Sequence, residues 1–73
     1  MKKISETHIK LGKRIKELRQ GLDMTQEDVA FEVGVDRSYM GFIERGEKNP
    51  TLLRLMKIAK ILKISLSGLF KSL

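Results

Sequence analysis

The sequence predicts an all-α protein, a compact bundle of five short helices forming one domain over residues 1–73. Three observations support this prediction. Apolar residues recur at intervals of three and four, a capping residue precedes each apolar run, and no segment alternates apolar and polar residues as a half-buried strand does. A chain of 73 residues has little core to stabilise it, and it contains no cysteine for a disulfide.

The first helix is expected to begin near Ser5 or Thr7 and to end between Gly21 and Asp23. Asp23 is a residue type that tolerates the left-handed conformation in which helices commonly end. The apolar face of this helix follows helical spacing and consists of Leu11, Ile15, Leu18 and Leu22.

Residues 26–45 have the pattern of a helix-turn-helix, the second and third helices of the bundle. Thr25 is the expected N-cap of the second helix, and Asp28 completes a capping box. Ala30 is small enough for two steeply crossing helices to touch, and Gly34 can adopt the positive φ of a tight turn. Asp36 is the expected cap of the third helix, which runs to about residue 45. The apolar residues that would hold it are Val29, Val33, Val35, Met40 and Ile43.

The last two helices are expected at residues 52–62, capped by Thr51, and after Ser65, which would cap a short helix. The predicted core stripe of the fourth helix consists of Leu52, Leu55, Met56, Ala59 and Leu62. Apolar residues outside this stripe predict a homodimer surface within residues 52–73; packing beneath the fifth helix is the alternative. The predicted dimer residues are Leu53, Ile61, Ile64, Leu66 and Leu73.

The chain is basic, and its charge is unevenly distributed. The net charge is +6 and the pI is near 9.9. Residues 1–20 hold seven Lys and Arg against two Glu, residues 21–36 hold five acids and no base, and residues 37–73 hold eight Lys and Arg against two Glu. Such a pI is typical of nucleic-acid-binding domains, so we expect an anion-binding surface assembled by folding.

The sequence lacks the residue types that other functions need. His8 is the only histidine, cysteine is absent, and the acids do not have metal-ligand spacing, so no metal, cofactor or small-molecule ligand is expected. No nucleophile–base pair or phosphate-binding glycine loop is present, so we do not expect an enzyme. No apolar h-region follows the basic start, and no apolar run is long enough to span a membrane. We therefore expect a cytoplasmic protein.

Three segments resemble one family of DNA-binding domains: GKRIKELR, TQEDVAFEVGVDRSYMGFIERGEKNP and LMKIAKIL. Over residues 9–70 the chain resembles the helix-turn-helix domain of the lambda-repressor and Cro type. TQEDVAF and DRSYMGFIERG are most similar to the controller proteins of bacterial restriction–modification systems. The resemblance implies a lambda-repressor-like fold and a homodimeric transcription regulator of a prokaryote or phage, binding a (pseudo)palindromic double-stranded DNA operator as repressor or activator. An antitoxin or a protein-interaction module with the same fold is the alternative.

In such a protein the third helix enters the major groove. Arg37 stands at its start and can pair with guanine O6 and N7. Gly41 weakens the helix, which is consistent with close approach of the backbone to DNA. Phe42 would contact a thymine methyl; alternatively, it folds back onto the domain or meets a protein partner. The predicted base contacts are Arg37, Ser38, Tyr39, Gly41 and Phe42.

Phosphate contacts are expected on either side of the third helix. Gln26 heads the second helix, where its amide and the free backbone N–H groups can bind phosphate. Other polar residues follow the third helix, and Lys13 and Arg14 are weaker candidates. The predicted phosphate contacts are Gln26, Arg45, Lys48, Asn49 and Thr51.

Two further predictions concern acidic residues. Helical spacing places Glu44 beside Met40 and Ile43, and the family resemblance implies that it pairs with Arg19 of the first helix. Two separate surface charges are the alternative. On the second helix, acids near the N-terminus compensate the helix dipole, or they form a contact surface for RNA polymerase. These acids are Glu27, Asp28 and Glu32; no function is assigned to Phe31 nearby.

Overall fold

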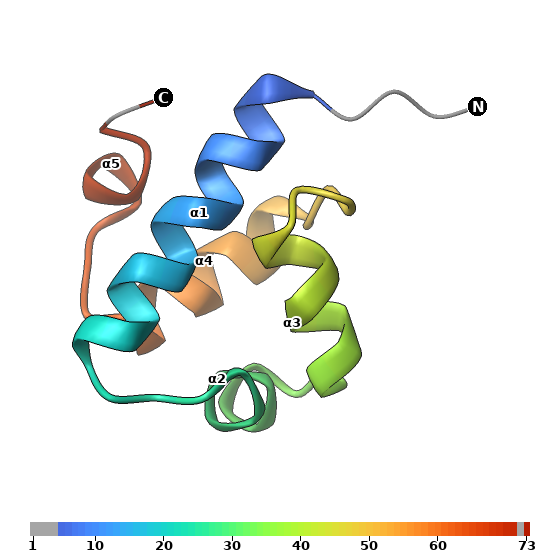
Figure 1. Cartoon of the computed structure of the whole chain (residues 1–73). Helices are drawn as coiled ribbons and strands as arrows, with labels where there is room; N and C mark the ends of the chain where they lie inside the picture. Colours follow the sequence, from blue (N-terminus) through green and yellow to red (C-terminus); the bar gives the residue numbers. More distant parts are fainter. Residues whose placement is uncertain (1–4, 72) are drawn as a thin grey trace.

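The computed structural model describes residues 5–71 and 73. Within these residues the chain forms five α-helices and no strand (Figure 1), which confirms the predicted fold class. None of the helices in the described range has the length and apolar character needed to span a bilayer. The helices are α1 Glu6–Gly21, α2 Gln26–Val33, α3 Arg37–Glu44, α4 Leu52–Ile61 and α5 Leu66–Leu69.

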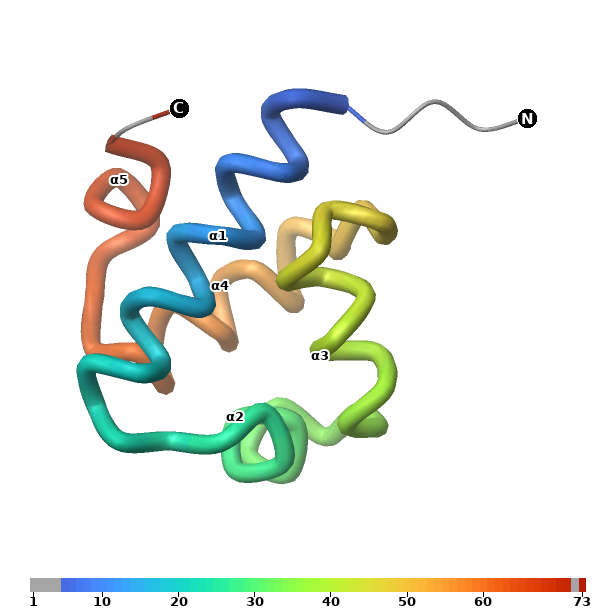
Figure 2. Tube along the Cα trace, viewed as in Figure 1, coloured from blue at the N-terminus to red at the C-terminus, as the bar shows by residue number. Residues whose placement is uncertain are grey.

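The five helices surround one core. Figures 1 and 2 show α1 crossing the front of the molecule with α4 behind it, α2 below and α3 to the right. α2 packs against α3 and α4, while α1 packs against α3 and α5. The short α5 therefore closes the bundle beside the first helix, although the two are far apart in the sequence.

Side-chain caps decide where four of the helices begin. The hydroxyls of Ser5, Thr25, Thr51 and Ser65 each accept a hydrogen bond from a backbone N–H of the following turn. At α2 the capping box is complete: Thr25 Oγ1 accepts from Asp28 N at 3.0 Å, and Asp28 Oδ2 accepts from Thr25 N at 2.8 Å. Asp36 occupies the N-cap position of α3 without a side-chain bond.

Left-handed residues end α1 and α2, as the sequence predicts. Asp23 has φ 57° and Gly34 has φ 87°. At the second site, Ala30 O accepts hydrogen bonds from Gly34 N at 2.8 Å and from Val35 N at 2.9 Å. These bonds close the last turn of α2 and redirect the chain into α3.

The core differs from the prediction on α4. Leu52 and Met56 were expected in the core but are 61% and 51% exposed, whereas Ile58 is fully buried. The buried stripe uses a neighbouring face of the helix with the same helical spacing. Packing against α2 and α5 selects this face, because the helix is apolar on more than one side. The buried apolar residues are Leu11, Ile15, Val29, Ala30, Val33, Met40, Ile43, Leu55, Ile58, Ala59, Leu62 and Leu69.

A glycine in α1 determines how closely α3 approaches. A Cβ at Gly12 would collide with the backbone carbonyl groups of Ile43 and Glu44. The two helix backbones can therefore touch only because position 12 has no side chain. This contact fixes the C-terminal end of α3 against α1.

Candidate nucleic-acid interface

The N-terminal turn of α3 presents two polar side chains to solvent. Arg37 and Ser38 are exposed, and among the described residues neither side chain has a hydrogen-bonding partner. Arg37 borders a shallow depression together with Thr25, Gln26 and Glu27 from the start of α2. The exposed starts of α2 and α3 thus lie on one side of the molecule. The start of α3 has no side-chain cap, so its free N–H groups favour anions.

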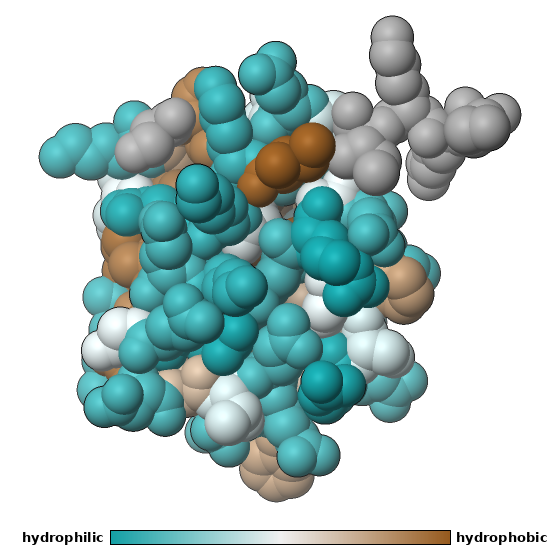
Figure 3. Space-filling model, in the orientation of Figure 1, coloured by the Kyte–Doolittle hydropathy of each residue, from teal (hydrophilic) through white to brown (hydrophobic). Residues whose placement is uncertain are grey.

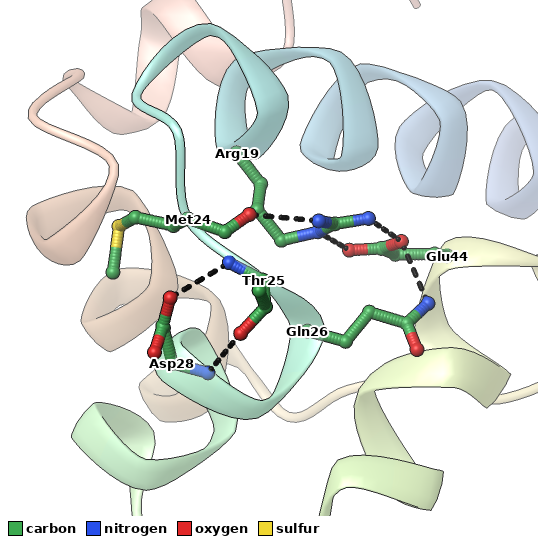
Figure 4. A network of polar contacts seen from close by, with 6 residues as sticks. All are labelled: Arg19, Met24, Thr25, Gln26, Asp28 and Glu44. Carbon is green, nitrogen blue, oxygen red and sulfur yellow. Dashed lines mark hydrogen bonds and ion pairs between the residues drawn. The ribbon is translucent and has the colours of Figure 1, made fainter.

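A buried polar network holds α3 in place (Figure 4). Arg19 Nε donates to Glu44 Oε2 at 2.6 Å, and Arg19 Nη2 donates to Glu44 Oε1 at 3.0 Å. Arg19 Nη1 donates to Met24 O at 2.8 Å, and Gln26 Nε2 donates to Glu44 Oε1 at 3.0 Å. Arg19 and Glu44 are each only 7% exposed.

In the described residues this network is the only set of polar side-chain contacts that joins α1, α2 and α3. Arg19 comes from the last turn of α1, Gln26 from the first turn of α2, and Glu44 from the last turn of α3. A bidentate pair between a guanidinium and a carboxylate fixes both direction and distance. The orientation of α3 relative to α1 and α2 is therefore set by directional bonds as well as by apolar packing.

A row of alternating cations and aromatic rings follows the outer face of α3. Arg45 Cζ lies 5.1 Å and Lys48 Nζ 5.4 Å from the centroid of the Phe42 ring. Lys48 Nζ is also 5.9 Å from the centroid of the Tyr39 ring, and Arg54 Cζ is 4.9 Å from it. All four distances are within the range of cation–π attraction. We call Arg45, Phe42, Lys48, Tyr39 and Arg54 the cation–ring row.

Comparison with known proteins identifies the family to which the chain belongs. The helix-turn-helix family matches residues 15–69 of the chain. The chain belongs to the helix-turn-helix family. The control protein C.MunI of a Mycoplasma species is 37% identical over 71 residues, which are 96% of this chain and 96% of the relative.

Solved structures of restriction–modification controller proteins have the same fold. C.AhdI from Aeromonas hydrophila superimposes with a TM-score of 0.86 at 41% identity, over 90% of this chain and 100% of that one. A chain of the C.Esp1396I tetramer, solved in complex with its natural 35-base-pair operator, superimposes with a TM-score of 0.82 at 37% identity, over 93% of this chain and 90% of that one. These relatives confirm the resemblance to controller proteins, and this chain is a helix-turn-helix transcription regulator.

Gly41 is covered, although the sequence predicts that it is open to DNA. It is buried, and a Cβ there would lie 3.1 Å from Arg45 Nη1 and 3.7 Å from Gln26 Oε1. The two side chains fold over the glycine and cover its backbone. Helical spacing alone placed Gly41 outward correctly, but it could not show that longer side chains close over it.

The predicted phosphate contacts fall into two groups. Lys48 and Asn49 are exposed, and Arg45, also exposed, forms an ion pair with Glu47 at 3.0 Å. By contrast, the Gln26 amide already donates to Glu44, and the Thr51 hydroxyl accepts from the N–H of Arg54.

The two weaker phosphate candidates on α1 differ in the same way. Lys13 is exposed. Arg14 Nη2 instead donates to the Gly68 carbonyl at 3.2 Å, so its side chain joins α1 to α5.

The predicted dimer residues are not equally accessible. Leu53 is 75% exposed and Leu73 is 41% exposed. Three others, Ile61, Ile64 and Leu66, are partly buried and pack against the core of their own protomer. Leu52 and Met56 add apolar surface on α4 that the sequence prediction assigned to the core.

The outer surface of α2 is acidic around one large apolar side chain. Glu27, Asp28 and Glu32 are exposed, and Phe31 is 85% exposed. The face of the molecule drawn in Figure 3 is mainly hydrophilic, with apolar residues appearing as small separate areas. Phe31 is the most exposed of the large apolar side chains in the described residues.

Arg54 is the residue near α3 that the sequence prediction missed. It lies in the first turn of α4, outside the predicted helix-turn-helix, and reaches the ring of Tyr39. A basic residue shortly after Pro50 was the only signal in the sequence. It was insufficient, because the contact depends on how α4 returns past α3.

Proposed function

We propose that this helix-turn-helix regulator binds a (pseudo)palindromic DNA operator as a homodimer, with α3 in the major groove. The observation that carries the proposal is the exposed, unpartnered start of α3, a helix whose last turn is held by the buried network of Arg19, Gln26 and Glu44. A groove-entering helix must be rigidly oriented for its side chains to reach base edges. The solved complex of the related controller C.Esp1396I with its operator supports DNA binding by this chain.

In this proposal Arg37 is the main base contact. Its guanidinium can form two parallel hydrogen bonds with guanine O6 and N7, and Ser38 beside it can donate to or accept from several bases. The basic residues after α3 would bind the flanking phosphates and hold the register. Because phosphate contacts carry no sequence information, affinity and specificity should depend on different residues.

The regulated system is proposed to be a restriction–modification locus, with the protein acting in the cytoplasm on its own operator. The likeness to C.MunI and C.AhdI supports this assignment. The exposed acids of α2 are the proposed contact for RNA polymerase if the protein activates transcription. The proposal includes no catalytic step.

The test begins with selection of bound sequences from a random duplex library. Arg37→Ala and Lys48→Ala are then compared by fluorescence anisotropy on the selected duplex and on a random-sequence duplex, across salt concentrations. Arg37→Ala should cost about 1–3 kcal/mol on the selected duplex and much less on the random one. Lys48→Ala should weaken both equally and reduce the slope of log affinity against log salt by about one.

Two outcomes would count against the proposal. If no sequence is enriched, the protein does not bind DNA specifically. If Arg37→Ala weakens both duplexes equally, Arg37 contacts phosphate, and the base-contacting face is wrongly assigned.

A further inference from the structure

We propose that the cation–ring row is a binding strip for the DNA sugar-phosphate backbone, with Arg54 as a further phosphate contact and with Tyr39 and Phe42 as positioning residues. The inference rests on the DNA binding proposed above. It adds Arg54 to the residues that contact DNA. It also assigns Tyr39 and Phe42 the function of holding cations, in place of the base contacts that the sequence predicts for them.

The Tyr39 ring is a fixed platform. It is partly buried and packs against the core, so it cannot swing away with the surface side chains. Lys48 from the α3–α4 loop and Arg54 from α4 both lie against it. A single core-anchored ring thereby contacts two cations, one from the loop and one from α4, which are six positions apart in the sequence.

The geometry leaves the cations able to bind phosphate. Stacking uses the flat face of a guanidinium, whereas its N–H groups point outward in the plane. In the part of the chain that the structure describes, neither Arg54 nor Lys48 donates a side-chain hydrogen bond. Their donors are therefore available to phosphate oxygens while the side chains remain against the rings.

Holding these side chains before binding has a thermodynamic effect. A free arginine or lysine loses rotamer freedom when it binds a phosphate, and this loss weakens binding. Contact with a ring restricts that freedom in the unbound protein already. The rings should therefore strengthen binding to any DNA sequence, which distinguishes this function from contact with a thymine methyl.

Phe42 is the ring that distinguishes the two functions. It is 36% exposed, and Arg45 and Lys48 both lie within 5.5 Å of its centroid. A thymine methyl on this ring would have to share the surface with two cations. As a support for Arg45 and Lys48, the ring instead keeps its neighbours in place when DNA binds.

The first experiment uses Arg54→Ala, with Lys60→Ala as the matched control. Both remove one exposed charge from α4, but Lys60 is not part of the row. Anisotropy titrations on a 20-base-pair random-sequence duplex should show a salt slope smaller by about 0.9 for Arg54→Ala. Lys60→Ala should retain the parent slope. Equal slopes for the two variants would overturn the assignment of Arg54.

The second experiment compares Phe42→Leu with Phe42→Tyr, after thermal melts have verified that both fold. Phe42→Leu should weaken binding about fivefold, equally on the random and the library-selected duplex, from lost cation–ring contacts. Phe42→Tyr keeps the ring and should bind like the parent. In an Arg45→Ala background, Phe42→Leu should cost less than it does alone. Weakening confined to the selected duplex would show a base contact and overturn the positioning function.

A third measurement tests the row without DNA. In the parent protein, NMR should place the δ protons of Arg54 upfield through the ring current of Tyr39, which is the only tyrosine in a chain without tryptophan. Unshifted δ protons would overturn the proposal even if the parent binds DNA. A parent that binds neither duplex would instead overturn the proposed function and this inference together.

Discussion

Glu44 of α3 accepts two hydrogen bonds from Arg19 of α1, at 2.6 and 3.0 Å, in a place where both residues are 7% exposed. Each charge is removed from water and depends on the other for compensation. Gln26 adds a third hydrogen bond to the same carboxylate. The relationship makes the last turn of α3 dependent on residues 18 and 25 positions earlier in the chain.

Breaking this pair should destabilise the protein strongly. Arg19→Met leaves a buried carboxylate without its counter-charge, and Glu44→Gln leaves a buried guanidinium, so each should lower the free energy of unfolding by about 3–5 kcal/mol. Urea denaturation of both variants is the measurement. The double variant Arg19→Met/Glu44→Leu serves as control and should recover part of the loss, because it leaves no lone charge. Two single variants as stable as the parent would contradict the structural function of the pair.

Removing the carboxylate next to Arg45 should strengthen DNA binding. Glu47 Oε2 is 3.0 Å from Arg45 Nε and competes with phosphate for that guanidinium. Glu47→Gln should therefore tighten binding to a random-sequence duplex. The slope of log affinity against log salt should become steeper, by less than the change that one complete phosphate contact produces. Glu32→Gln, which removes an exposed acid from α2, is the control for net charge. The same gain in both variants would mean that only overall charge matters.

The proposed dimer can be tested at Leu53 without disturbing the core. Because Leu53 is 75% exposed, Leu53→Glu should leave the monomer folded and raise the monomer fraction in sedimentation equilibrium. Phe31→Glu changes an even more exposed apolar residue outside the predicted dimer surface and should leave association unchanged. Ile61→Glu should also dissociate the dimer, with some loss of stability because Ile61 packs partly against the core. A parent that is monomeric at high micromolar concentration would refute this surface.

Acid should remove the contribution of the α2 capping box. Hydrogen bonds from the backbone N–H and the side chain of Thr25 lower the pKa of Asp28 below its ordinary value of 3.8. Because the pKa of Asp28 is lower in the folded state than in the unfolded state, the ionised carboxylate stabilises the protein at any pH above its unfolded-state pKa. This contribution disappears as the pH falls through the folded-state pKa. Asp28→Asn should therefore lower the melting temperature at pH 7, and the difference should vanish below the folded pKa.

The control for Asp28→Asn is Glu27→Gln, which removes an acid from the same first turn of α2. The described structure gives Glu27 no capping bond, so its variant should show a smaller difference from the parent at pH 7. Equal pH profiles for the two variants would mean that the first-turn charge, and not the cap, produces the effect.

The exposure of two predicted base contacts could be inferred from the sequence, because their position follows from local structure. Arg37 and Ser38 come directly after the Asp36 cap, so the start of α3 places them at the exposed end of a helix. The Arg19–Glu44 contact required family resemblance, since no local rule joins residues 25 positions apart. Arg54 and the cation–ring row were not predicted, because stacking depends on how a loop and a later helix return to α3.

The sequence by itself determined where the helices begin and end. Capping at Thr25 and the left-handed turn at Gly34 involve atoms within a few residues of one another, so their free energies depend little on the rest of the chain. Only the tertiary structure decided that Ile58 is buried while Leu52 and Met56 remain outside. The faces of α4 have comparable apolar spacing, and burial against α2 and α5 chooses between them. That free energy exists only once the helices have packed together.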